Sequence, residues 1–230
     1  MAPLFILLCR QGENSMQINT PPSTLVYLID DEFAVRDSLT FLIESTGQAV
    51  RSFESANDFL NDYSHEQPSC LILDVRMPSM SGLELQEELS NREISIPIIF
   101  ISGHADISDS AKAFRAGAID FLEKPFDNEI LLKRIEEAIQ KDIETKEHLI
   151  KKRQIQQRLD HLTAREKEVL SLIVSSYSNK EAAMKLNISN RTIDVHRAHI
   201  MEKMRAENLA ELMMMVMPFE IVPHGVEVSD

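Results

Sequence analysis

Five short apolar runs, each followed by an amphipathic stretch, fill the chain from Leu25 to about Gln140 and constrain its fold more than any other feature. The runs read LVYLI, QAVRSF, CLILD, IPIIFIS and AIDFLE. Helix-like segments lie between or after them, near residues 33–46, 55–64, 82–91, 105–116 and 127–140. This alternation predicts a five-stranded, doubly wound parallel sheet of the α/β class. The first, third and fourth runs are almost continuously apolar, so we expect them at the centre of the sheet, whereas QAVRSF alternates as an edge strand does.

The chain changes character after Gln140, where strand signals stop. A charged stretch without Gly or Pro follows, and we expect it to extend the preceding helix as a linker. Beyond it, a short helix, a turn at Asn187 and a longer helix capped by Ser189 predict a small all-α helix-turn-helix domain. The expected organisation is an N-terminal extension at 1–23, an α/β domain at 24–140, a helical linker at 141–160, a helix-turn-helix domain at 161–217 and a flexible tail at 218–230.

Composition and charge bound the class of protein. The chain is 43% hydrophobic and 27% charged, which is typical of a soluble globular protein, and no apolar run reaches the roughly 20 residues of a membrane span. Its two cysteines, Cys9 and Cys70, cannot build a disulfide framework, so we expect a reducing, cytoplasmic location. A net charge of −13 excludes nucleic-acid binding over the whole surface but allows a local basic face. The opening MAPLFILLC makes a poor signal peptide, and we hypothesise that Met16 is the true initiator.

Reactive side chains stand at the ends of four of the expected strands. Asp30 and Asp31 follow the first strand, Asp74 ends the third, Ser102 the fourth, and Lys124 follows the fifth. Because the carboxyl ends of parallel strands meet at one edge of a sheet, these side chains should converge on one crevice. Clustered carboxylates favour a hard cation such as Mg²⁺, and Asp74 could then attack a phosphoryl group whose oxygens Lys124 and Ser102 bind. Each residue alone could equally cap a strand or open a turn.

The motifs DD, LILDVRMPSMSG, FISGH and DFLEKPF resemble those of a two-component receiver domain, and the gaps between them match that family's spacing. The resemblance implies that Asp74 is the phosphoacceptor. It also implies that Mg²⁺ is the cofactor. Its expected protein ligands are Asp30, Asp31, Asp74 and the backbone carbonyl of Arg76.

The same resemblance assigns a switch to the fourth and fifth strands. Ser102 stands at the family's Thr/Ser position, and Lys124 is the family lysine, with an expected cis bond to Pro125. Phe121 stands at the aromatic switch position and should turn inward when Ser102 engages the phosphoryl group. The alternative is that Phe121 is a plain core aromatic on a half-buried strand.

The segments LTAREKEVL, SNKEAAMKL and ISNRTIDVHRAHIMEKM resemble a LuxR-type helix-turn-helix, so the chain is similar to a NarL/FixJ-family response regulator of the FixJ-like branch. In the recognition helix, Arg197 could read guanine and Asp194 cytosine. The alternative for its basic residues is a solvated charged face. The implied DNA-binding residues are Asn179, Lys180, Arg191, Thr192, Asp194, Val195, Arg197, Ala198 and Lys203.

The helix-turn-helix segment departs from the family pattern. Ser176 or Tyr177 stands where the family has Gly, so a left-handed helix end there would cost about 1 kcal/mol. Ala182 replaces a larger aliphatic residue, which should thin the packing of the first helix of the motif.

On this resemblance, a sensor histidine kinase phosphorylates Asp74 and the receiver then dimerises. The dimer contacts are expected on the receiver face 105–140 and on a C-terminal helix at 207–217. Promoter DNA and RNA polymerase are the further expected partners, and no membrane contact is expected. The chain should hydrolyse its own phosphoryl group without acting on a separate substrate.

Two alternatives remain. One is a constitutive DNA-binding regulator with an inert receiver. The other is a Mg²⁺-dependent phosphatase with an aspartyl intermediate. Such an enzyme needs a second acid two residues after the nucleophile, where this chain has Arg76.

Overall fold

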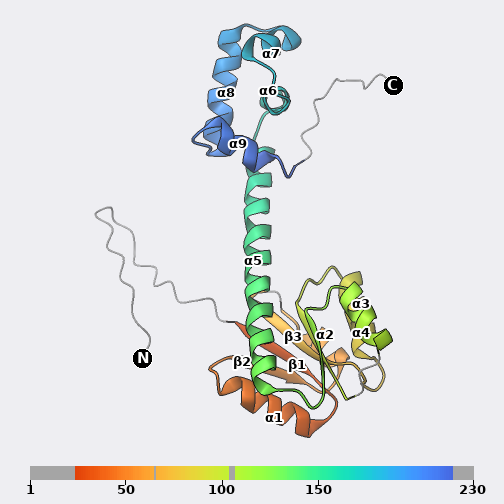
Figure 1. Cartoon of the computed structure of the whole chain (residues 1–230). Coiled ribbons are helices and arrows are strands. Elements are labelled where there is room, and N and C mark those ends of the chain that lie inside the picture. Colours follow the sequence, from red (N-terminus) through yellow and green to blue (C-terminus); the bar gives the residue numbers. More distant parts are fainter. Residues whose placement is uncertain (1–23, 65, 104–106, 220–230) are drawn as a thin grey trace, which may run out of the picture. The chain divides into compact units, whose positions relative to one another are not determined.

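The computed structural model describes residues 24–64, 66–103 and 107–219 (Figure 1). The chain divides into two compact units, one up to Ile143 and one from Glu144. The expectations for residues 1–23, including Met16 and Cys9, and for the tail beyond 219 concern parts outside the described residues.

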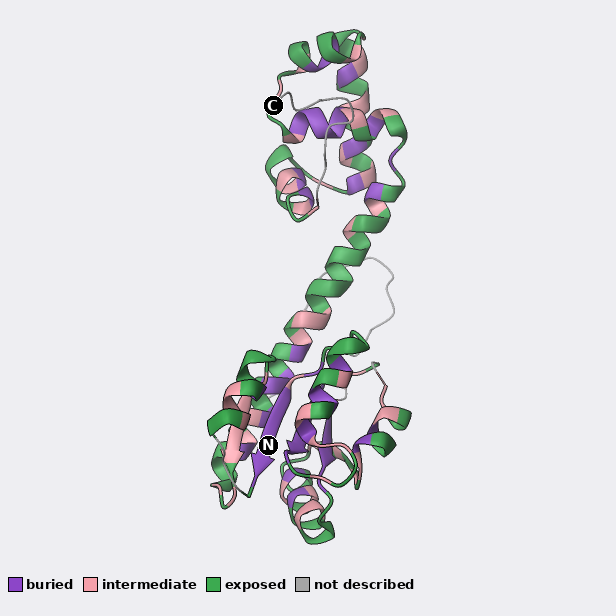
Figure 2. Ribbon diagram, turned by 90° about the vertical axis from the view of Figure 1, so that its right-hand side faces the viewer, coloured by how far each residue is buried: buried purple, intermediate pink, exposed green. Residues whose placement is uncertain are grey.

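The first unit contains a five-stranded parallel sheet with the strand order β2-β1-β3-β4-β5. The central strands β1, β3 and β4 are buried along their whole length, whereas β2 is exposed or half-buried, which confirms the expected placement of both kinds of run (Figure 2). The strands are β1 (Leu25–Ile29), β2 (Ala49–Phe53), β3 (Ser69–Asp74), β4 (Ile98–Ser102) and β5 (Asp120–Glu123).

Helices cover both faces of this sheet, and alternate residues of the central strands serve the two cores. Tyr27, Leu71 and Phe100 belong to one buried cluster, which also includes residues of α2, α3 and α4. Leu28 and Ile72 belong to the other cluster, with residues of α1 and α5. The helices are α1 (Phe33–Glu44), α2 (Ala56–Asp62), α3 (Gly82–Asn91), α4 (Ile107–Arg115) and α5 (Asn128–Asp160).

Helix α5 continues through the segment expected to be a linker, so that segment is helical as predicted. The helix expected at 105–116 begins at Ile107, and residues 104–106 lie outside the described part of the chain. Within the described residues, no helix combines the length and apolar character needed to span a membrane.

The second unit is all-helical around its own apolar core, as predicted. Thr163 and Ser178 begin their helices with complete capping boxes, and Ser189 caps the next helix. Asn187 and Ser176 both take left-handed backbone conformations, with φ of 52° and 63°, so the expected turn and the expected left-handed end without glycine are both present. The helices are α6 (Ala164–Val174), α7 (Asn179–Leu186), α8 (Asn190–Met204) and α9 (Leu209–Val216).

Candidate functional site

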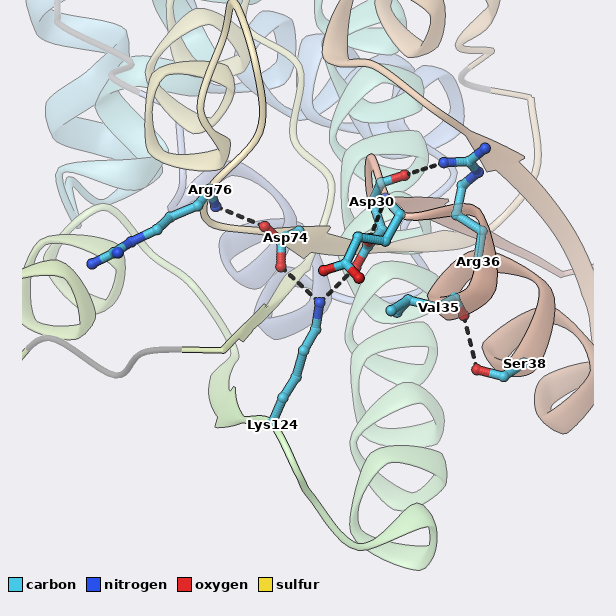
Figure 3. Close-up of polar contacts among 8 residues, drawn as sticks. Asp30, Val35, Arg36, Ser38, Asp74, Arg76 and Lys124 are labelled. Carbon is cyan, nitrogen blue, oxygen red and sulfur yellow. Dashed lines mark hydrogen bonds and ion pairs between the residues drawn. The ribbon is translucent and has the colours of Figure 1, made fainter.

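Two acids and a lysine meet at the carboxyl edge of the sheet, where the sequence predicted a crevice. The ammonium Nζ of Lys124 lies 2.7 Å from Oδ2 of Asp30 and 2.9 Å from Oδ1 of Asp74 (Figure 3). Asp30 follows β1, Asp74 ends β3, and Lys124 follows β5. Asp30 is fully buried and Asp74 is 6% exposed. The parallel topology therefore brings three residues that are distant in sequence into direct contact.

The remaining oxygen of each carboxylate accepts a hydrogen bond from the backbone. Oδ1 of Asp30 accepts from the amide of Glu32 at 2.9 Å, and Oδ2 of Asp74 accepts from the amide of Arg76 at 2.7 Å. The guanidinium of Arg76 points away from this pair of acids (Figure 3). Arg76 therefore contacts Asp74 through its backbone amide, whereas the metal ligand that the resemblance implied is its backbone carbonyl, which stays a prediction.

Arg36 supports the site from α1 and was missed from the sequence. Its Nη1 donates to the backbone carbonyl of Asp30 at 2.7 Å, and its Nη2 lies 3.7 Å from Glu54. The guanidinium also lies over the ring of Phe33, 5.8 Å from the ring centroid. A lone arginine in the first turns of a helix has no spacing pattern that would reveal these contacts.

Burial and the neighbouring charges shift the pKa values of Asp74 and Lys124. Burial and, more weakly, the charge of Asp30 raise the pKa of Asp74, and hydrogen bonds from Lys124 and the Arg76 amide only partly offset this. For Lys124, burial lowers the pKa, but the two carboxylates outweigh it and raise the pKa above its ordinary value. Lys124 is therefore held as an ammonium beside an acid that is more basic than usual.

The three predicted acidic metal ligands are not equally placed. Asp30 and Asp74 share the ammonium of Lys124, whereas Asp31 is exposed. Among the residues that the structure describes, no three acidic, histidine or cysteine side chains cluster closely enough to hold a metal ion. The donors that do meet are carboxylate oxygens beside a backbone turn at Arg76, and this chemistry fits a hard cation such as Mg²⁺.

The predicted switch residues lie on neighbouring strands. Ser102 ends β4 and is 1% exposed, and its carbonyl accepts from the amide of Lys124 at 2.7 Å. Phe121, on β5, is half-buried, with its ring centroid 6.1 Å from that of Phe100. The bond between Lys124 and Pro125 is cis, as the resemblance implied.

Gly82 brings α3 against the site. It is the first residue of α3, and its amide donates to the carbonyl of Val75 at 3.0 Å. A Cβ atom at Gly82 would overlap the backbone carbonyl oxygen of Asp74 and touch Leu73 and Phe100. The glycine in the motif is therefore explained by close backbone approach to the acid.

The helix-turn-helix presents most of the predicted DNA-contact residues to solvent. Thr192 is half-buried, with its hydroxyl 2.8 Å from the hydroxyl of Ser189. Asn179 is the first residue of α7 and is hydrogen-bonded to Asp194 and Arg197 of α8. The predicted contact residues that are exposed are Lys180, Arg191, Asp194, Val195 and Ala198.

Lys203 is engaged within the protein. Its Nζ lies 2.6 Å from Oε2 of Glu166, whose side chain is 4% exposed. Burial raises the pKa of Glu166, but hydrogen bonds from Lys203 and Thr163 prevail and lower it to about 2. Glu166 lies on α6 and Lys203 on α8, 37 positions apart, so the sequence did not reveal this pair.

Two family models match the chain. Residues 26–136 match the response regulator receiver domain, and residues 160–216 match the bacterial regulatory proteins of the luxR family. The response regulator protein TodT of Pseudomonas putida is 41% identical over 204 residues, which cover 89% of this chain and 88% of that protein. The transcriptional regulatory protein FixJ of Rhizobium meliloti is 40% identical over 192 residues, which cover 84% of this chain and 94% of FixJ.

Solved structures show the same architecture. The low-resolution structure of the response regulator StyR matches with a TM-score of 0.77 at 41% identity, covering 86% of this chain and 100% of StyR. Full-length FixJ from B. japonicum matches with a TM-score of 0.52 at 38% identity, over 84% of this chain and 95% of that one. The chain therefore belongs to the response regulators, as a transcriptional regulator that joins a receiver domain to a LuxR-type DNA-binding domain.

Proposed function

We propose that a sensor histidine kinase controls this regulator by transferring a phosphoryl group to Asp74, and that the phosphorylated chain binds promoter DNA as a dimer. The observation that carries the proposal is the contact of Lys124 with both Asp30 and Asp74 at the carboxyl edge of the sheet.

The proposed location is the cytoplasm. Free Cys70, buried in β3, supports a reducing, cytoplasmic location.

In the transfer step, a carboxylate oxygen of Asp74 forms the new bond to phosphorus as the bond from phosphorus to the kinase's histidine nitrogen breaks. The raised pKa of Asp74 makes it the more basic nucleophile. Lys124 is already an ammonium within reach, so it can follow the negative charge from the carboxylate to a phosphoryl oxygen. The hydroxyl of Ser102 would bind a second phosphoryl oxygen.

Receiver domains generally bind Mg²⁺ for phosphorylation. Here the ion would be held by Asp30, Asp31, Asp74 and the backbone carbonyl of Arg76, and it would neutralise charge on the phosphoryl oxygens. Arg36 fixes the backbone of Asp30 through its carbonyl and so holds one of these ligands in place.

The receiver face 105–140 is proposed to become the dimer contact. Large apolar side chains are already exposed there: Ile107 is 86% exposed, Phe114 48% and Ile130 47%. Phe121 lies on the strand between α4 and α5, so its movement toward Ser102 would reshape this face. Linkage requires the reshaped face to bind its partner copy better than the resting face does.

The proposed second dimer contact is the C-terminal helix at 207–217. In the structure this helix is α9 (Leu209–Val216); Met214 on it is 67% exposed, and Met217 directly after it is 74% exposed. The proposed DNA contacts are those predicted from the sequence, without Lys203, because Glu166 already binds its ammonium. Few basic residues per protomer would make binding by one protomer modest, so tight binding would depend on dimerisation, and the combined phosphate contacts of the dimer would make it strongly salt-dependent.

The test is an intact-mass measurement after incubation with acetyl phosphate and Mg²⁺. We expect a single phosphoryl adduct on the unmodified chain and none on Asp74→Asn or without the metal. An adduct that persists in Asp74→Asn would overturn the assignment of the phosphoacceptor.

Promoter binding by the same samples tests the output. We expect phosphorylated protein to bind a selected duplex more tightly than Asp74→Asn does. Equal binding by both would favour the constitutive regulator with an inert receiver.

A further inference from the structure

The side-chain amide of Asn179 connects two residues of the recognition helix. Its Nδ2 donates to Oδ1 of Asp194 at 2.7 Å, and its Oδ1 accepts from Nη1 of Arg197 at 3.0 Å. The amide nitrogen therefore donates to a carboxylate, and the amide oxygen accepts from a guanidinium. Asp194 and Arg197 are the two side chains predicted from the sequence to read bases.

The backbone that carries Asn179 is itself fixed. Asn179 is the first residue of α7, directly after Ser178, whose capping box with Glu181 is complete. The amide of Ser178 donates to Oε2 of Glu181 at 2.8 Å, and the hydroxyl of Ser178 donates to the same oxygen at 2.6 Å. The Asn179 side chain thus starts from a defined position at the turn between α6 and α7.

Asp194 and Arg197 are three residues apart on α8, a spacing that places opposite charges side by side on a helix. Elsewhere in this chain, pairs at the same spacing close into ion pairs: Arg165 with Glu168 at 2.6 Å, and Lys112 with Asp109 at 3.6 Å. In the described part of α8, Asp194 and Arg197 instead meet through the Asn179 amide.

We propose that Asn179 is a positioning residue that determines base specificity by holding Arg197 away from Asp194. The proposal rests on the proposed DNA-binding function and names one determinant of its selectivity. With Asn179 present, only one of the five N–H groups of Arg197 is used by the amide, and the remaining groups stay available to a base edge in the major groove. Without it, Arg197 closes onto Asp194 and the two charges neutralise each other.

The role of Asn179 differs from that of its neighbour Lys180. Lys180 is an exposed ammonium, so it would contribute phosphate attraction that is independent of sequence. Asn179 carries no charge and adds nothing to counterion release. Its loss should therefore lower selectivity without changing the salt dependence, whereas the loss of Lys180 should do the reverse.

The experiment uses the full chain, phosphorylated with acetyl phosphate, and a duplex library with a randomised core. The consensus selected by the unmodified protein becomes the probe, together with versions that carry single base-pair changes. Affinity and salt slope are measured for Asn179→Ala, Asp194→Ala, the double variant, Arg197→Ala and the control Lys180→Ala. Circular dichroism melting verifies that each variant is folded.

We expect Asn179→Ala to bind the consensus about tenfold more weakly and to lose discrimination at the base pair that Arg197 reads, with an unchanged salt slope. Lys180→Ala should weaken all duplexes similarly and lower the slope by about one. In the Asp194→Ala background, Asn179→Ala should have little further effect, because Arg197 then has no carboxylate on which to close.

Two results would overturn the proposal. One is an Asn179→Ala variant with normal base preference although Arg197→Ala loses it. The other is an equal loss on removing Asn179 in both backgrounds, which would indicate that Asn179 contacts DNA directly or serves helix structure alone. If Arg197→Ala itself leaves base preference intact, the DNA interface proposed above is wrong, and the positioning role fails with it.

Discussion

Lys124 and Asp74, 50 positions apart in the chain, are joined by a hydrogen-bonded ion pair of 2.9 Å at the edge of the sheet. Lys124 directly follows β5 and Asp74 ends β3, and β4 lies between these two strands in the sheet. Because Asp30 binds the same ammonium, the resting site holds two carboxylates around one cation. A phosphoryl group on Asp74 would replace one of these carboxylates as a partner of Lys124, so phosphorylation must rearrange this contact.

The first prediction concerns the stability of Asp74→Asn. The pKa of Asp74 is raised in the folded state, so its ionised form is less favourable there than in the unfolded chain. This cost is absent below the ordinary pKa of 3.8 and grows as the pH rises through the folded pKa. We therefore expect Asp74→Asn to melt higher than the unmodified protein at pH 7, with the advantage shrinking toward pH 3. Melting curves across this range provide the measurement.

The matched control is Asp37→Asn, which removes an exposed carboxylate from α1. It should melt like the unmodified protein at every pH. A lower melting temperature for Asp74→Asn at pH 7 would show that the pairing with Lys124 outweighs the burial of Asp74.

The second prediction is that Gly82→Ala damages the site through the backbone. The added Cβ would overlap the carbonyl oxygen of Asp74, so either α3 or the end of β3 must move. We expect a loss of stability of about 2 kcal/mol, as for overpacking of a core, together with slower phosphorylation by acetyl phosphate. Gly103→Ala has open space around its Cβ and serves as the stability control. Equal stability of the two variants would contradict the prediction.

Much of the receiver could be predicted because its signals are local. Apolar runs fixed which strands are central, and parallel strands necessarily bring Asp30, Asp74 and Lys124 to one edge. What could not be predicted are contacts that depend on how two helices cross. Lys203 has the charge of a DNA contact, but its partner Glu166 lies 37 positions earlier. The amide of Asn179 likewise acquires its role only when α7 and α8 are docked.

The third prediction concerns the start of the expected linker. Asp142 lies within the segment predicted to be a linker, but the residue is 2% exposed and its carboxylate accepts a hydrogen bond from the amide of Ser69 at 2.8 Å. This contact fastens α5 to the first residue of β3. Asp142→Ala would leave a buried amide without its partner, which costs about 1–3 kcal/mol.

Hydrogen exchange at the Ser69 amide and urea unfolding of the receiver measure this effect. Glu147→Ala, an exposed acid on the same helix, is the control and should leave both unchanged. An unaltered Ser69 amide in Asp142→Ala would refute the anchoring role.

The last prediction separates stability from DNA contact in the LuxR-type domain. Hydrogen bonds from Lys203 and Thr163 overcome the effect of burial and lower the pKa of Glu166 to about 2, so its ionised form stabilises the folded state. That stabilisation is complete above the ordinary pKa of 4.5 and is lost as the pH falls toward about 2. We expect Glu166→Gln to lose about 2 kcal/mol at pH 7, and the difference from the unmodified protein to vanish in acid.

Hydrogen exchange of α6 and α8 reports on this domain alone and avoids assuming that the two units unfold together. Glu168→Gln, with a half-exposed ion pair on the same helix, is the control and should change little. Lys203→Met should reproduce the loss of protection seen in Glu166→Gln, because it removes the other half of the pair. Normal protection in Lys203→Met, combined with a lower salt slope for DNA binding, would instead return Lys203 to the DNA interface.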